Sequence, residues 1–137
     1  MYVEIGDNIL ERCDALQVIT QVDYYYGQFD NLGNVLINPP AVFLDYQNQD
    51  EGPERNVEGE IFITLHVAIS ALEHEPRSAL KLVEALKAEL NDSAIHDRSE
   101  GGNNAYIAKC FYKGFRLRTD VAGLIVYEVY LKVVCVS

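Results

Sequence analysis

Two long stretches of the sequence alternate apolar and other side chains with a period of two. The first is Gly59–Ser70 and the second is Leu124–Val136. Because successive side chains of a strand point to opposite faces of a sheet, this alternation predicts two half-buried β-strands. Both stretches are longer than the usual strand of about five or six residues. Their matched length and alternation predict that they pair antiparallel in the middle of one sheet.

The clearest helix in the sequence lies between these two strands. Residues Arg77–Asn91 carry an apolar stripe at helical spacing, and Pro76 stands where the first helical position is expected, a place that proline tolerates well. One core is expected to contain the inward side chains of this helix and of both strands. These residues are Ile63, Leu65, Val67, Leu86, Val129, Leu131 and Val133.

Other segments complete the expected order of elements. A helix is predicted over Glu4–Leu16, strands over Gln17–Tyr26, Ala41–Tyr46 and Ile107–Arg118, the last broken at Gly114, and a polar loop over Ser93–Asn104. Strands joined by turns, together with two amphipathic helices, predict an α+β fold with a mainly antiparallel sheet and both helices on one face. The other face, which carries Thr64 and His66, is expected to be hydrated or to contact another subunit.

Length and charge limit the classes of function. A chain of 137 residues without internal repeats or a linker predicts a single domain, residues 1–137. The net charge of −10 argues against stable binding of nucleic acid or of an anionic membrane. The N-terminus does not resemble a signal peptide and no apolar run is long enough to span a membrane, so a cytoplasmic protein is expected.

The sequence contains no recognisable catalytic or cofactor motif. Its histidines, His66, His74 and His96, form neither HExxH nor another metal-ligand spacing. The three cysteines, Cys13, Cys110 and Cys135, are widely spaced, which is typical of reduced thiols in a cytoplasmic protein. No phosphate-binding glycine loop is present. We therefore expect no metal, no cofactor and no enzymatic activity.

Two groups of residues are candidates for contact with a partner. The polar connection Gln47–Glu58 contains a cluster of carboxylates, which either face a partner or form a solvated loop. The cluster consists of Asp50, Glu51, Glu54 and Glu58. Within the aromatic run that follows the first helix, Tyr24 and Tyr26 fall on the same side of a strand. Tyrosines are frequent at protein interfaces because they give a large contact area at low entropic cost.

The chain as a whole resembles the tail terminator proteins of tailed bacteriophages and prophages, which complete the tail and join it to the head. The resemblance follows a short N-terminal helix, VDYYYGQFDN, the proline-led strand NPPAVFLDYQNQ, the central strand GEIFITLHVAIS, the helix SALKLVEALKAEL and the final strand LIVYEVYLKVVCV. Such proteins have a mainly antiparallel α/β fold and assemble as rings, often hexameric, that cap the tail tube.

The resemblance implies a structural function in virion assembly. It implies self-association, contact with tail-tube or head-completion proteins, and a location in the cytoplasm during assembly and then in the virion tail. The acidic cluster is then expected to face the ring lumen or the tail tube. The alternative class is a non-catalytic adaptor or ligand-binding module of a mobile element, which would not form a ring.

Overall fold

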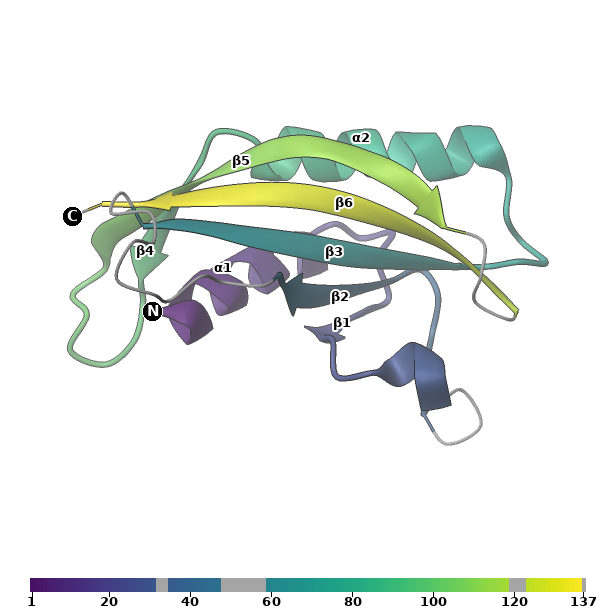
Figure 1. The fold of residues 1–137 in the computed structure, drawn as a ribbon, viewed down its shortest axis with the longest axis horizontal. Coiled ribbons are helices and arrows are strands. Elements are labelled where there is room, and N and C mark those ends of the chain that lie inside the picture. The colour runs from purple at the N-terminus through teal and green to yellow at the C-terminus, as the bar shows by residue number, and fades with distance from the viewer. Residues whose placement is uncertain (32–34, 48–58, 119–122, 137) are drawn as a thin grey trace.

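The computed structural model describes residues 1–31, 35–47, 59–118 and 123–136 (Figure 1). Its elements are α1 (Tyr2–Asp14), β1 (Gln21–Tyr24), the 3-10 helix η1 (Gln28–Asn31), β2 (Ala41–Tyr46), β3 (Glu60–Ser70), α2 (Pro76–Leu90), β4 (Ser93–Asp97), β5 (Ala105–Arg118) and β6 (Leu124–Cys135). Within the described residues, six strands form one sheet in the order β1-β2-β3-β6-β5-β4. The fold is therefore α+β, as the sequence predicts.

The two long strands form the centre of the sheet. β3 pairs antiparallel with β6 along its whole length, and Leu65 lies opposite Val129 while Ile63 lies opposite Leu131. The predicted pairing is thus confirmed. All seven residues of the predicted core belong to one buried cluster on the face of the sheet that carries the helices, called the helix face below.

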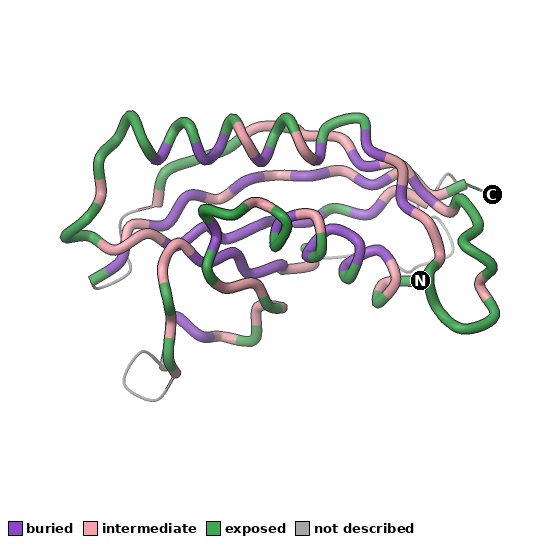
Figure 2. The backbone as a smooth tube through the Cα atoms, turned by 180° about the vertical axis from the view of Figure 1, so that it is seen from behind, coloured by how far each residue is buried: buried purple, intermediate pink, exposed green. Residues whose placement is uncertain are grey.

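Both helices pack on the helix face, as Figure 1 shows. Along α2 the backbone alternates between buried and exposed turns (Figure 2), as expected for a helix with one apolar stripe. Pro76 begins the helix, and the Glu75 carboxylate accepts hydrogen bonds from the backbone N–H groups of Arg77 and Ser78. These bonds satisfy donors that a helix start otherwise leaves unpaired, which fixes where α2 begins.

Two local predictions need correction, and one pair of strands departs from the antiparallel majority. Residues Ser93–Asp97 form strand β4 instead of a loop, because Ile95 is fully buried and the pairing with β5 satisfies the backbone. The aromatic strand predicted over Gln17–Tyr26 is shorter, since β1 covers only Gln21–Tyr24. β1 also runs parallel to β2, so the sheet is mostly but not wholly antiparallel.

The opposite face, called the second face below, is covered in part by the chain itself, whereas it was expected to be hydrated or to contact another subunit. A second buried cluster joins η1 to β2, β3 and β6. It consists of Phe29, Ala41, Phe43, Ala68, Leu124 and Val126. Thr64 and His66, which were expected to face water or another subunit, are buried on this face within the single chain. The segment after β1 contributes Phe29 to this cluster, and its apolar ring replaces water over that end of the sheet.

Candidate functional site

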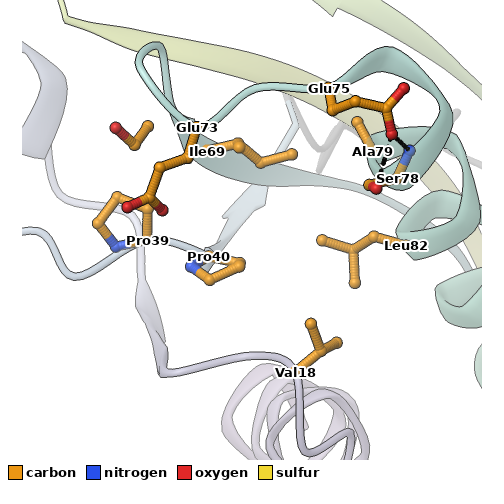
Figure 3. Close-up of a pocket in the computed structure, with 10 residues that line it drawn as sticks. Val18, Pro39, Pro40, Ile69, Glu73, Glu75, Ser78, Ala79 and Leu82 are labelled. Atoms are coloured by element: carbon orange, nitrogen blue, oxygen red, sulfur yellow. Dashed lines mark hydrogen bonds between the residues drawn. The ribbon is translucent and has the colours of Figure 1, made fainter.

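A small pocket lies between the start of α2, the end of β3 and the segment that leads into β2 (Figure 3). Its volume is about 160 Å³. The lining residues come from three segments of the sequence: position 18, positions 39–40 and positions 69–82. They are Val18, Pro39, Pro40, Ile69, Ser70, Glu73, Glu75, Ser78, Ala79 and Leu82. The walls are mostly aliphatic, so the pocket suits an apolar group.

Two carboxylates, Glu73 and Glu75, stand among the residues that line this pocket. Hydrogen bonds lower the pKa of Glu75. The largest effect comes from the Ser78 hydroxyl, and smaller effects come from the backbone N–H groups of Arg77 and Ser78. Glu75 therefore stays ionised at neutral pH and already occupies the donors at the start of α2. The pocket consequently disfavours anions and favours an apolar group that arrives with positive charge.

A polar cluster lies near the covered end of the second face, centred on His66. The Nε2 atom of His66 is 3.2 Å from Asp45 Oδ2, and its Nδ1 atom is 3.9 Å from Glu128 Oε2. The rings of Tyr25 and Phe29 lie 4.7 and 5.8 Å from the imidazole, measured between ring centroids. These contacts tie the segment around η1 to β2, β3 and β6, and we assign the cluster a structural role.

Glu128 connects this cluster to strand β5. Its Oε1 atom accepts hydrogen bonds from Arg116 Nη2 at 2.9 Å and from the Tyr130 hydroxyl at 2.8 Å. Burial alone would raise the pKa of Glu128, but the hydrogen bonds from Tyr130 and Arg116 and the charge of Arg116 outweigh it and lower the pKa. The carboxylate is therefore ionised throughout the neutral range.

This lowered pKa predicts how stability depends on pH. The folded pKa of Glu128 lies below its usual value of 4.5, so the ionised form stabilises the fold above that pH. The contribution is lost as the pH falls through the lowered pKa. We expect Glu128→Gln to lose less stability than the wild type between about pH 5 and pH 2. Urea midpoints of both proteins across this range check it, and parallel pH profiles would contradict it.

The other half of the second face, over β5 and β6, has a different character. It carries a shallow depression with basic and aromatic side chains, lined by Tyr106, Lys109, Phe111, Lys113, Lys132, Val134, Cys135 and Val136. Two of the lysines have acidic neighbours: Lys109 Nζ is 2.8 Å from Asp92 Oδ1, and Lys132 Nζ is 3.5 Å from Glu60 Oε1. The two carboxylates offset much of the positive charge of this depression.

Strand β5 also presents an edge without a strand partner. β4 pairs with β5 only between Ala105 and Cys110, and no described strand pairs with the outer side of β5 beyond that point. On the helix face of this end, the side chains of Phe115 and Leu117 are 43% and 46% exposed. Exposed strand edges with apolar side chains are surfaces at which proteins associate.

The structure places the predicted contact residues in different ways. Asp50, Glu51, Glu54 and Glu58 lie outside the described residues. The Tyr24 hydroxyl donates a hydrogen bond to Asp7 Oδ1 at 2.7 Å, which attaches this side chain to α1. Tyr26 is exposed. The sequence did not predict the pocket, although Pro39-Pro40 marks one of its walls.

The described residues include no group of three or more His, Cys, Asp or Glu side chains arranged to hold a metal ion. Cys13 and Cys110 are buried free thiols, and burial raises the pKa of each to about 12. Both thiols are therefore protonated at neutral pH and poorly nucleophilic. Neither described helix has the length and apolar character that a membrane-spanning segment needs.

Neither a scan against protein-family models nor a search of curated proteins finds a match for this chain.

Proposed function

We propose that this protein is a structural component of a tailed bacteriophage or prophage, which self-associates into a ring and caps the tail tube or joins the tail to the head. The observation that carries the proposal is that one subunit bears two different and complementary surfaces. One is the apolar pocket with Glu73 and Glu75 in its lining, and the other is the apolar, positively charged end of β5.

Charge favours a contact between unlike surfaces. The outer end of β5 carries Lys113, Arg116 and Arg118, and Arg116 is offset by the nearby Glu128, so two such edges paired about a two-fold axis would still bring positive charge together. Two pockets facing each other would likewise bring carboxylates together. A head-to-tail contact instead joins surfaces of opposite charge, and repeated head-to-tail contacts close as a ring when the rotation between subunits permits.

The fold supports the same proposal. The central pair of strands, β3 and β6, is long and supported by two helices, which gives a stiff subunit suited to a structural ring. The resemblance to tail terminator proteins rests on the order of the sequence elements and on their residue types. It suggests tail-tube or head-completion proteins as the partners. A location in the cytoplasm during assembly and in the virion tail afterwards is part of the proposal.

Sizing of the purified protein at several concentrations tests the proposal. We expect the mass from sedimentation equilibrium to rise with concentration toward a single closed species, because a ring ends growth. Added salt is expected to shift this equilibrium toward the monomer, since opposite charges at exposed surfaces are screened. A monomer at every concentration would contradict self-association and favour a stand-alone adaptor or ligand-binding module.

A further inference from the structure

We infer that the pocket beside α2 receives the side chain of Leu117 from a neighbouring copy of the same chain. The inference rests on the proposed self-association and names the contact that would produce it. It assigns the pocket to one subunit and the inserted side chain to the next.

The size and lining of the pocket select the kind of group that fits. A cavity of about 150 Å³ with aliphatic walls accommodates a benzene molecule. The pocket described here, at about 160 Å³, therefore has room for one leucine or phenylalanine side chain but not for a helix or a strand. Its walls include Val18, Pro40, Ile69 and Leu82, which offer only apolar contacts.

Among the exposed apolar side chains of the described residues, Leu117 has the surroundings that this pocket requires. It lies between Arg116 and Arg118, on the end of β5 whose outer side has no described strand beside it, while β6 pairs with its inner side. Leu117 is opposite Tyr127 and therefore on the helix face, whereas Arg116 is bound to Glu128 on the second face. Arg116 is therefore paired and stays outside the pocket, and the net positive charge of residues 113–118 draws this end of β5 toward Glu73 and Glu75 from a distance.

Leu72 is the main competing side chain, because it is almost fully exposed. It is adjacent to Glu73, which lines the pocket, so its insertion into a second copy requires two pockets to approach each other. Glu73 and Glu75 of both copies would then face one another without the opposing cations that the β5 end supplies. Like charges at close range disfavour this arrangement.

The arrangement of strands prevents one subunit from filling its own pocket. Pairing with β6 holds Leu117 opposite Tyr127, and β6 separates β5 from β3, the strand that contributes Ile69 to the pocket. Leu117 therefore lies two strands away from Ile69 and cannot enter the pocket of its own subunit. Each copy donates one side chain and receives one, which is a head-to-tail contact.

Three variants separate the two halves of the contact. Leu117→Asp removes the inserted side chain. Val18→Lys places a long cation at the pocket, and because Val18 is 54% exposed the change is compatible with the fold. The matched control is Val136→Asp, since Val136 has the same exposure as Leu117 (45% against 46%) but lies near the C-terminus, at the opposite end of the sheet (Figure 1). Circular dichroism and urea midpoints show whether each variant is folded.

Sedimentation of the variants alone and mixed tests the inference. We expect Leu117→Asp and Val18→Lys each to be monomeric, and their equimolar mixture to form a dimer that grows no further, because only one intact contact remains. Val136→Asp is expected to assemble like the wild type. Leu117→Ala, which adds no charge, is expected to weaken association about tenfold to a hundredfold, the equivalent of one buried leucine.

The possible failures are distinguishable. If the wild type associates but Leu117→Asp or Val18→Lys associates equally well, this inference is wrong while self-association stands. If both variants are monomeric but their mixture forms no dimer, the two residues do not meet and the inference is also wrong. A wild type that remains monomeric overturns the proposed function and this inference together.

Discussion

Replacement of Phe43 by alanine is expected to lower the free energy of unfolding by about 3–5 kcal/mol, the usual cost of truncating a buried phenylalanine. Phe43 in β2 is fully buried, and its ring centroid lies 5.9 Å from that of Phe29 in η1. The ring is thus enclosed between the sheet and the 3-10 helix. Urea denaturation of the wild type and the variant measures the loss.

Phe62 provides the matched control for this prediction. It lies on the same face of the sheet, in β3 opposite Lys132, but is 45% exposed. We expect Phe62→Ala to lower the free energy of unfolding by about 1 kcal/mol or less, because little apolar surface is transferred from water. Equal losses for the two variants would mean that η1 does not cover one half of the second face.

Truncation of Leu131 to alanine is expected to cost about 2–5 kcal/mol. Leu131 lies in β6 opposite Ile63 of β3 and is buried in the cluster beneath the helices. The cavity left by its side chain lies between the centre of the sheet and the helices, where the close-packed surroundings have little freedom to collapse. A thermal or urea unfolding series measures the effect.

The next residue along the strand, Lys132, is the control for Leu131. Its side chain points to the second face and its ammonium group is 3.5 Å from the Glu60 carboxylate. Partly exposed ion pairs of this kind contribute about 0–1 kcal/mol, so Lys132→Ala is expected to cost little. Similar losses for Leu131→Ala and Lys132→Ala would show that the faces of β6 are assigned wrongly.

The parts of the fold that the sequence predicted well depend on local signals. The pairing of β3 with β6 follows from the period-two alternation of both strands. A shift of one residue in register would move the apolar side chains from the buried face to the other face of the sheet. The start of α2 follows from Pro76 and from the turn before it. The predicted break at Gly114 is wrong, because β5 continues through this residue, but Gly114 does mark an irregularity: the register with β6 shifts there and its φ is +135°. Each of these features is fixed by a few neighbouring residues.

The parts that were missed depend on contacts between distant residues. Strand β4 has the composition of a polar loop, and it is a strand because Ile95 is buried and β5 pairs beside it. The burial of His66 likewise depends on Tyr25 and Phe29, which reach the second face from beyond β1. Local propensity carries no information about either contact.

The candidate site was less predictable than the fold for the same reason. The pocket combines Val18, Pro40 and the stretch from Ile69 to Leu82, and no spacing in the sequence connects these three segments. The tyrosines were identified from composition, but the structure attaches Tyr24 to α1 through Asp7. The solvent exposure of an apolar side chain decides whether it belongs to the core or to a contact surface. This exposure is a property of the folded chain and cannot be read from the sequence.

Negative-stain images of the concentrated protein, alone and mixed with phage tail tubes, test the central claim most directly. The account predicts closed rings of uniform diameter in the protein alone and the same rings at tube ends in the mixture. Closed rings are expected because a head-to-tail contact of fixed rotation repeats until it meets itself. Particles of monomer size at all concentrations, with bare tube ends in the mixture, would contradict the account.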